Sequence, residues 1–305
     1  MASPHISTNF QDVLDPRFEE IFWERYKSLP DLTPRLYNME GTNGRNNMTW
    51  SQVGTVDDFT EFTGSVSYGS MNQGYDTILT PVEFTKGIQA ERKLLDDDQF
   101  NILDARPKGL ATSAARTKQK HAAQMFNNAF AIDNTFYNNT EGIPLCSNAH
   151  LTTSGASTAT GFDNLTTGAL SATSVATARI LMKKFRGDQA ERISVMPNEL
   201  LYPLDLYEEA YEIIKASGKV DTDLNNPNVH EGQYTGIEWE YLTDTNNWFL
   251  MDSSGREQML HWSDRTALEF AFIEDFDTII GKWRGYCRYG AAHSDWRFIL
   301  GSQVS

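Results

Sequence analysis

The sequence has little positive charge and almost no cysteine. It holds 26 Lys and Arg residues against 41 Asp and Glu residues, which gives a formal net charge of −15 at pH 7. A protein that grips nucleic acid needs a dense Lys/Arg patch to neutralise phosphates, and the sequence supplies none. Its two cysteines, Cys146 and Cys287, are far apart and form neither a disulfide framework nor a zinc motif. These shortages argue against DNA binding as the main task and indicate a reducing compartment during synthesis.

Long apolar runs are missing as well. No stretch approaches the ~20 apolar residues that a membrane-spanning helix needs. The first residues do not form a secretion signal, because Asp12, Asp15, Glu19 and Glu20 interrupt them. We therefore expect no membrane partner.

The signatures of common catalytic and cofactor sites are also absent. The chain has no phosphate-binding G-x-x-x-x-G-K-[ST], no H-E-x-x-H and no G-x-S-x-G elbow, and no two histidines have a metal-type spacing. Glu238 and Glu240 flank Trp239, and carboxylates at i and i+2 could work as an acid–base pair. Alternation on a half-exposed strand explains them better. We expect no catalytic, cofactor-binding or metal-ligating residues, and an acidic hydrolase acting through this pair is one alternative.

What the chain does have is a long, polar ribbon. Residues 74–99 predict an extended strand whose apolar side is formed at period two by Ile78, Val82, Phe84, Ile88 and Ala90. Pro81 cannot donate to a sheet ladder and predicts a sheet edge, whereas Gly87 predicts a bulge or a close backbone approach. Residues 59–68 alternate too, and residues 69–74 form a turn-rich tip. An isolated ribbon is marginal in water, so we expect it to lie on a neighbouring subunit.

Helices and strands are interspersed along the remaining sequence. The first predicted helix has one or two turns at residues 18–26 and is stopped by Pro30 and Pro34, and Asp96–Asp98 open a second, short helix. A longer helix is predicted at residues 110–134, after a break at Pro107 and Gly109. Two more follow: one capped by Ser171 or Thr173 that ends at Gly187, and one at residues 197–218. The predicted strands cover residues 193–196, 237–242, 248–251 and much of 267–305. There is no regular βαβ rhythm, so the predicted class is α+β.

Four stretches, taken in order, carry a resemblance to a known family. They are residues 85–98 (TKGIQAERKLLDDD), 142–150 (GIPLCSNAH), 198–203 (NELLYP) and 283–290 (WRGYCRYG). Together with the order of elements they resemble the major capsid protein of tailed bacteriophages, with the HK97-type fold, and in particular its Mu-like branch.

The resemblance implies a division of the chain into five parts. These are an N-terminal arm at residues 1–50, an extended β-hairpin loop at 51–91, a peripheral domain with a long spine helix at 92–196, an axial domain at 197–270, and C-terminal strands returning to the peripheral domain at 271–305. Some relatives carry a charged helical segment ahead of the arm, and its lack here implies a separate scaffolding protein or a mature form. Lys86 is not assigned the cross-linking role known in some relatives.

The resemblance also implies a function and partners. Copies of the chain would assemble into hexamers and pentamers of an icosahedral shell in the virion, made in the host cytoplasm and enclosing double-stranded DNA without strong specific binding. Portal, scaffolding and decoration proteins would be further partners. An encapsulin-like nanocompartment shell is the alternative within the same fold. The candidate assembly contacts lie in the arm and the ribbon, where aromatic and polar side chains reach outward: Phe18, Phe22, Phe62, Tyr68, Met71, Asn72, Gln73, Tyr75 and Phe84.

Overall fold

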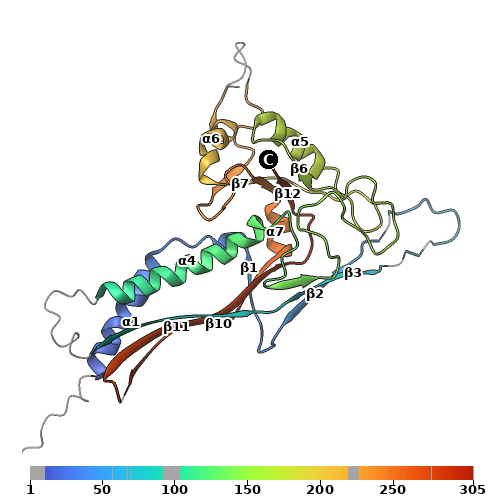
Figure 1. The fold of residues 1–305 in the computed structure, drawn as a ribbon. Coiled ribbons are helices and arrows are strands. Elements are labelled where there is room, and N and C mark those ends of the chain that lie inside the picture. The colour runs from blue at the N-terminus through green and yellow to red at the C-terminus, as the bar shows by residue number, and fades with distance from the viewer. Residues whose placement is uncertain are drawn as a thin grey trace, which may run out of the picture.

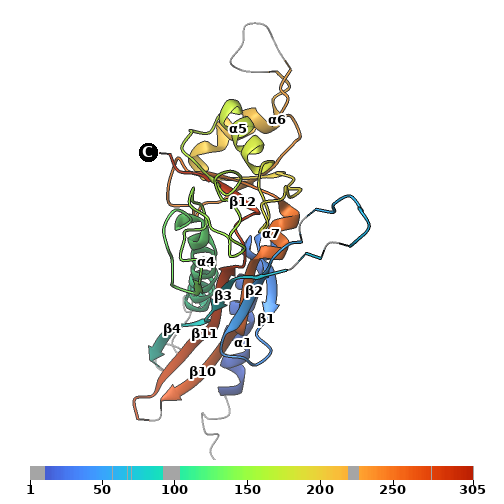
Figure 2. The ribbon, with the colours of Figure 1, turned by 90° about the vertical axis from the view of Figure 1, so that its right-hand side faces the viewer.

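The computed structural model describes residues 11–56, 58–66, 68–69, 71–91, 104–218, 227–275 and 277–304, with only the backbone of residues 11–16. It has a lower lobe built around long strands, an upper lobe of shorter elements, and a loop that projects to one side (Figures 1 and 2). Helices and strands are interspersed without a regular βαβ rhythm, which confirms the predicted α+β class.

The lower lobe is a four-stranded sheet of order β1-β10-β11-β4. Its strands are β1 (Asn38–Gly41), β10 (Leu260–Asp275), β11 (Ile280–His293) and β4 (Val82–Glu91). The helices α1 (Gln11–Ser28) and α4 (Ala105–Asn127) pack on one face of this sheet, where Phe22 contacts Phe270 and Phe84 contacts His121. The short helices α2 (Thr33–Leu36) and α7 (Ser253–Met259) lead into β1 and β10.

The upper lobe is a five-stranded sheet of order β6-β12-β9-β7-β8. Its strands are β6 (Leu165–Thr166), β12 (Ile299–Ser302), β9 (Trp248–Met251), β7 (Glu199–Tyr202) and β8 (Thr235–Glu238). With them go α5 (Ala172–Met182), the 3₁₀ turn η3 (Leu204–Leu206) and α6 (Tyr207–Lys215). A third sheet of order β2-β3-β5, with β2 (Met48–Val53), β3 (Gln73–Leu79) and β5 (Tyr137–Asn139), carries the projecting loop.

One hydrophobic core runs through both lobes and includes Phe126, Trp239, Trp262 and Leu300. Small side chains on α4, such as Ala122, let other elements approach closely, and Ala122 O accepts a hydrogen bond from Tyr37 Oη at 2.5 Å. A buried ion pair joins the lobes. Arg256 of α7 donates from Nε to Glu199 Oε2 of β7 at 2.7 Å and also donates to the carbonyl of Leu36 in α2. Removing one partner of such a pair costs about 3–5 kcal/mol, because the other charge is left buried without compensation.

Several local predictions are confirmed. The strand predicted at 248–251 is β9, and Ser171 caps α5, where its hydroxyl accepts from Ser174 N in a capping box. The helix predicted around residues 18–26 is part of α1, which ends before Pro30. Pro34 does not stop a helix but lies in the first turn of α2, where a missing N–H is tolerated.

The predicted ribbon needs correction. The described residues within 59–68 form no strand, and β3 pairs instead with β2 and β5. The long strand is divided at Pro81 into β3 and β4, and β4 is an edge strand that pairs with β11 within the same chain. At Gly87 the β4–β11 register is unbroken, and an added Cβ would lie 3.1 Å from Trp283 O, so the glycine serves a close approach and not a bulge.

Other boundaries were also wrong. Pro107 and Gly109 lie inside α4, because the first turn of a helix has free N–H groups and admits proline. Residues 193–196 form no strand, and residues 199–202 form β7 where a helix was predicted. All four residues of β7 are buried, so the strand shows no alternation and cannot be told from a buried helix by periodicity. The helix predicted to open at Asp96–Asp98 lies outside the described residues.

Candidate assembly surfaces

The loop between β2 and β3, residues 54–72, is the most exposed apolar segment among the described residues. It reaches away from both lobes (Figure 2). Its exposed large side chains are Val56, Phe59, Phe62, Val66, Tyr68 and Met71, with Tyr68 93% exposed. Burying one such side chain is worth about 1.5–3 kcal/mol, and a cluster of this kind marks an interaction surface.

The base of this loop is fixed to the body. Gly54 N donates to Asn72 O at 2.8 Å, and an added Cβ at residue 54 would lie 2.7 Å from that oxygen. Thr55 Oγ1 donates to a carboxylate oxygen of Glu191, and Thr153 Oγ1 donates to Gln73 O at 2.9 Å. The loop therefore leaves the body from a hydrogen-bonded base, while its large apolar side chains are exposed.

The predicted contact residues of the loop and those of the arm are placed differently. Asn72, Gln73, Phe62, Tyr68 and Met71 are exposed. Tyr75 is half-buried in β3. Their role in assembly remains a prediction.

The arm aromatics lie against their own chain. Phe18 packs edge-on to Trp283 with ring centroids 5.1 Å apart, and Phe22 stacks on Phe270 at 4.6 Å. Both are buried, so the outward-reaching aromatics expected in this arm are not present at these two positions. Helical spacing of Phe18 and Phe22, together with the apolar face of β10 and β11, is the signal that favours internal packing.

Phe84 belongs to an aromatic cluster inside the lower lobe. Its ring lies 4.8 Å from Tyr289 and 4.4 Å from His121, and His121 Nδ1 lies 2.7 Å from Tyr289 Oη. Burial lowers the pKa of His121, which favours the neutral imidazole. Phe84 therefore helps to pack α4 against the sheet.

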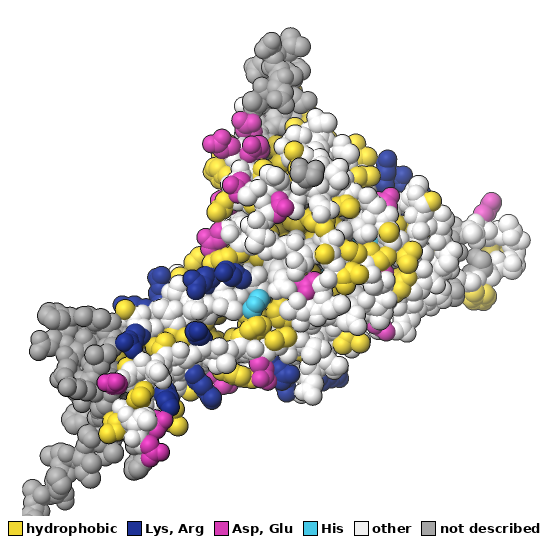
Figure 3. Space-filling view, in the orientation of Figure 1, with side chains coloured by type: hydrophobic (Ala, Val, Ile, Leu, Met, Phe, Trp, Pro, Cys, Tyr) yellow, Lys and Arg dark blue, Asp and Glu magenta, His cyan; other side chains and the backbone are white. Residues whose placement is uncertain are grey.

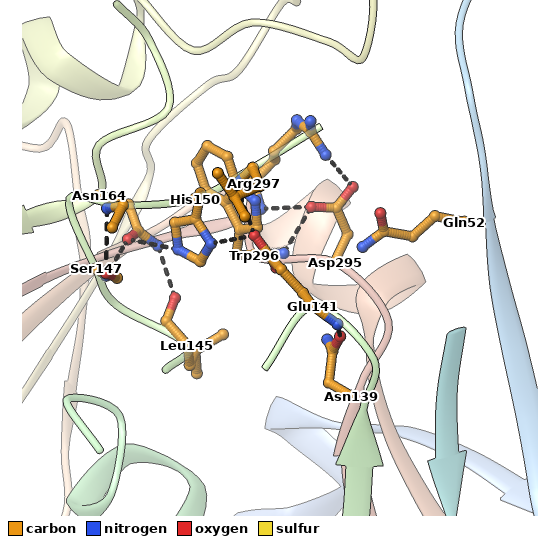
Figure 4. Close-up of polar contacts among 12 residues, drawn as sticks. Gln52, Asn139, Glu141, Leu145, Ser147, His150, Asn164, Asp295, Trp296 and Arg297 are labelled. Atoms are coloured by element: carbon orange, nitrogen blue, oxygen red, sulfur yellow. Dashed lines mark hydrogen bonds and ion pairs between the residues drawn. The ribbon is translucent and has the colours of Figure 1, made fainter. Parts of the chain in front are cut away.

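The segment 142–150, which the sequence singled out, is held by a buried polar network (Figure 4). His150 Nδ1 lies 3.0 Å from Glu141 Oε1, and His150 Nε2 lies 3.1 Å from Asn164 Oδ1. The ring stacks on Trp296 at 4.2 Å. Asn164 also donates from Nδ2 to Leu145 O at 2.8 Å.

This network positions a loop and leaves no open coordination for a substrate. His150 is 2% exposed and Asn164 is fully buried. Glu141 Oε1 also accepts from Leu151 N at 3.0 Å, and Asn164 Oδ1 accepts from Ser147 N at 2.7 Å. These donors and acceptors already have partners, and Asn164 Nδ2 also donates to Ile299 O of β12 at 3.1 Å, so the network fixes residues 141–151 against β12.

The two thiols and the carboxylate pair give no sign of catalysis. Burial raises the pKa of both Cys146 and Cys287, the latter to about 11, so both thiols are protonated at neutral pH. Glu238 and Glu240 are exposed on either side of buried Trp239, as alternation predicts. They lie at a pocket of about 370 Å³ whose lining is mainly apolar.

Neither a metal centre nor a membrane span is found in the described part of the chain. Among the described residues, no group of three or more His, Cys, Asp or Glu side chains could hold a metal ion. No helix in the ranges given above has the length and apolar character needed to cross a membrane.

Charge is unevenly distributed over the surface. Basic side chains follow α4, acidic side chains gather over α6, and a separate basic group lies toward the far end of α5 (Figure 3). This segregation occurs in a chain with a net charge of −15, so local surfaces differ strongly from the average.

The fold is similar to several solved phage and phage-like capsids. The capsid of a native GTA particle has a TM-score of 0.54 at 12% identity, covering 91% of this chain and 92% of that chain. The procapsid of bacteriophage JBD30 has a TM-score of 0.55 at 13% identity, covering 98% and 76%. Mycobacterium phage Che8 has a TM-score of 0.55 at 13% identity, covering 90% and 93%. These similarities confirm the predicted HK97-type capsid fold.

Sequence comparison gives the family. No curated protein matches this chain. The family described as "Phage capsid protein" matches residues 74–301 of the 305 residues. It is a family of structural proteins of the virion, which agrees with the expectation that the chain is not an enzyme. Because the match covers well over half of the sequence, the chain belongs to the phage capsid protein family.

Proposed function

We propose that this chain is the major head subunit of a tailed phage, and that its copies assemble as hexamers and pentamers into an icosahedral shell around double-stranded DNA. The observation that carries the proposal is the projecting loop, residues 54–72, with exposed Phe59, Phe62 and Tyr68. A loop of this composition gains stability only by covering another surface. A neighbouring copy supplies such a surface at every position of a closed shell.

The assignment of the capsid domains to the two lobes is part of this proposal. We infer that the lower lobe with α4 is the peripheral domain and its spine helix, and that the upper lobe is the axial domain near the centre of each capsomer. The upper sheet draws β6 and β12 from outside residues 197–270, so the axial unit includes more of the chain than a single continuous segment. The four sequence stretches named above support the Mu-like branch as the finer placement.

Other partners follow from the same proposal. One related structure is the capsid of bacteriophage JBD30 decorated with minor capsid protein trimers, at a TM-score of 0.56 and 11% identity over 71% of this chain. By analogy we propose a decoration protein for this chain, and portal and scaffolding proteins from the family resemblance. The net charge of −15 suits a container that does not adhere to the DNA it encloses.

The test separates assembly from folding. We expect Phe59→Ser, Phe62→Ser, Tyr68→Ser and Met71→Ser, combined in one variant, to abolish capsomers and shells in negative-stain micrographs and sizing. The urea midpoint of the monomer should stay close to the wild type, because these side chains are exposed.

A matched control replaces exposed apolar side chains elsewhere, with Leu151→Ser, Met196→Ser and Val229→Ser. Normal shells in the loop variant would contradict the proposal. Equal loss of assembly in the control would show that the loop has no special role.

An encapsulin-like compartment remains the second candidate, because the same fold can enclose protein cargo. The content of purified shells distinguishes the two: nuclease-protected DNA supports a phage head, and a single co-purifying enzyme supports a compartment. The acidic hydrolase is not favoured, because Glu238 and Glu240 occur in a family of structural proteins.

A further inference from the structure

The upper lobe has an acidic edge on α6 and η3. Asp205, Glu208, Glu209 and Glu212 are all exposed there. None of them takes part in the ion pairs formed among the described residues. We call these four residues the acidic edge.

The C-terminal end of α5 carries the opposite charge. Arg179, Lys183 and Lys184 are exposed there and likewise have no ion-pair partner in the described chain. We call these three residues the basic edge. In Figures 1 and 3 the two edges lie on opposite sides of the upper lobe, so they cannot neutralise each other within one copy.

Each edge also exposes apolar side chains. Next to the acids, Tyr207 and Tyr211 are 49% and 54% exposed, with ring centroids 6.2 Å apart. Beside the cations, Ile180 is 54% exposed. Favourable interaction with helix dipoles accounts for acids at the start of α6 and cations at the end of α5. It does not account for two tyrosines and an isoleucine left in water beside them, a combination typical of an interface core with a charged rim.

We propose that the acidic edge of one copy binds the basic edge of the next copy around a ring. Tyr207 and Tyr211 of one copy would cover Ile180 of its neighbour, and the aliphatic parts of Lys183 and Lys184 would lie along the tyrosine rings. This inference rests on the proposed function, because it names the surfaces through which the upper lobes meet in a capsomer.

The charge pattern also selects the symmetry of the contact. A two-fold contact brings the same patch of both copies together and would place acids against acids or cations against cations. A head-to-tail contact pairs unlike edges at every junction, and it closes into a ring when the rotation between neighbouring copies divides a full turn. The two edges therefore fit a cyclic ring and disfavour a two-fold dimer through the upper lobe.

The test uses charge reversal at both edges. The acidic-edge variant is Glu208→Lys, Glu209→Lys and Glu212→Lys, and the basic-edge variant is Arg179→Glu, Lys183→Glu and Lys184→Glu. Each variant alone presents like charges at every junction, so we expect at least about a tenfold loss of capsomers by sizing and micrographs. All six substitutions in one chain restore opposite charges and should restore assembly.

A mixture of the two variants gives a sharper result. One variant then has only basic edges and the other only acidic edges, so the copies must alternate. Rings with an even number of copies can close, whereas rings with an odd number retain one repulsive junction. We expect hexamers to recover and pentamers to remain depleted in the equimolar mixture.

A matched control reverses three exposed acids away from both edges, with Glu20→Lys, Glu24→Lys and Glu257→Lys, and should assemble as the wild type does. Circular dichroism and urea unfolding check that every variant folds. The inference is overturned if the variant with all six substitutions fails to assemble, or if the single-edge variants assemble normally. It is also overturned by a basic-edge variant that assembles normally but encloses less DNA, since that edge then binds phosphates. Failure of the wild-type chain itself to assemble overturns the proposed function instead.

Discussion

The helix α1 and the loop 54–72 contain similar aromatic side chains and have opposite environments. Phe22 in α1 is fully buried, whereas Phe59 in the loop is fully exposed. In α1 the aromatics recur at helical spacing and meet the apolar face of β10 and β11. In the loop they alternate, but no strand of the described chain lies beside them. Aromatic content alone therefore does not identify an intersubunit contact, and the presence of a matching apolar face within the chain decides where the side chain goes.

The largest effect on stability is expected from truncating the buried aromatic side chain of α1. Phe22→Ala should lower the free energy of unfolding by about 3–5 kcal/mol, because it leaves a cavity among Phe270, Tyr26 and Trp23. Urea unfolding followed by tryptophan fluorescence measures it. A loss below about 1 kcal/mol would mean that α1 is not docked as described.

Acid titration should also distinguish the body from the loop. Burial, with His150 and His261 nearby, lowers the pKa of His293 from its ordinary 6.5 to about 3, while Asp295 opposes the shift. Between pH 6.5 and 4.5 the unfolded chain therefore binds a proton that the folded chain does not. The free energy of unfolding should therefore decrease as the pH is lowered through this window, by up to about 1.4 kcal/mol per pH unit. The buried, neutral His121 and His261 act in the same direction.

The control for this titration is His293→Gln, which should have a shallower slope of unfolding free energy against pH over the same window. An unchanged slope would assign the acid sensitivity to other groups. The rate of limited proteolysis within the loop 54–72 should be the same at pH 6.5 and pH 5.5, where the protein is still folded.

A smaller effect is expected at the base of the loop, where the two environments meet. Thr55→Val keeps the shape of the side chain but removes its hydrogen bond to Glu191, which should cost about 1–2 kcal/mol. Hydrogen exchange at Gly54 N should become faster, because this amide closes the base against Asn72. Thr173→Val on the exposed surface of α5 is the control, and similar exchange at Gly54 in wild type and Thr55→Val would show that the base is not held by Thr55.

The smallest effect on stability is expected at the tip. Phe62→Ala should change the free energy of unfolding by less than about 0.5 kcal/mol, since the side chain is 72% exposed. Assembly should nevertheless weaken, as measured by the concentration at which capsomers appear. A stability loss as large as that of Phe22→Ala would show that Phe62 packs within its own chain.

The sequence predicts the fold best where a local rule acts alone. Ser171 starts α5 because a hydroxyl there caps free N–H groups, and β9 was predicted with its observed bounds from a short apolar run. It predicts poorly where a distant partner decides. The pairing of β4 with β11 joins residues about two hundred positions apart, and β7 becomes a strand because β8 and β9 flank it. The alternation at 59–68 had no such partner.

The candidate site shows the same limit. The exposure of Phe62, Tyr68 and Met71 could be predicted from the sequence, but the tip predicted at residues 69–74 was wrong, because Asn72 closes the base of the loop and β3 begins at Gln73. The internal packing of Phe18 and Phe22 could not, because it depends on Phe270 and Trp283 far along the chain. The charged edges of the upper lobe were not predicted either, since α5 and α6 come from separate segments whose placement on one sheet follows only from the tertiary fold.

The position of β12 has a consequence for synthesis. This strand, Ile299–Ser302, lies between β6 and β9, and all four of its residues are buried. A nascent chain still on the ribosome and lacking these residues cannot close the upper sheet, however much of the lower lobe it has formed. Chains that end before Ile299 would thus lack the strand between β6 and β9 and could not complete the upper lobe.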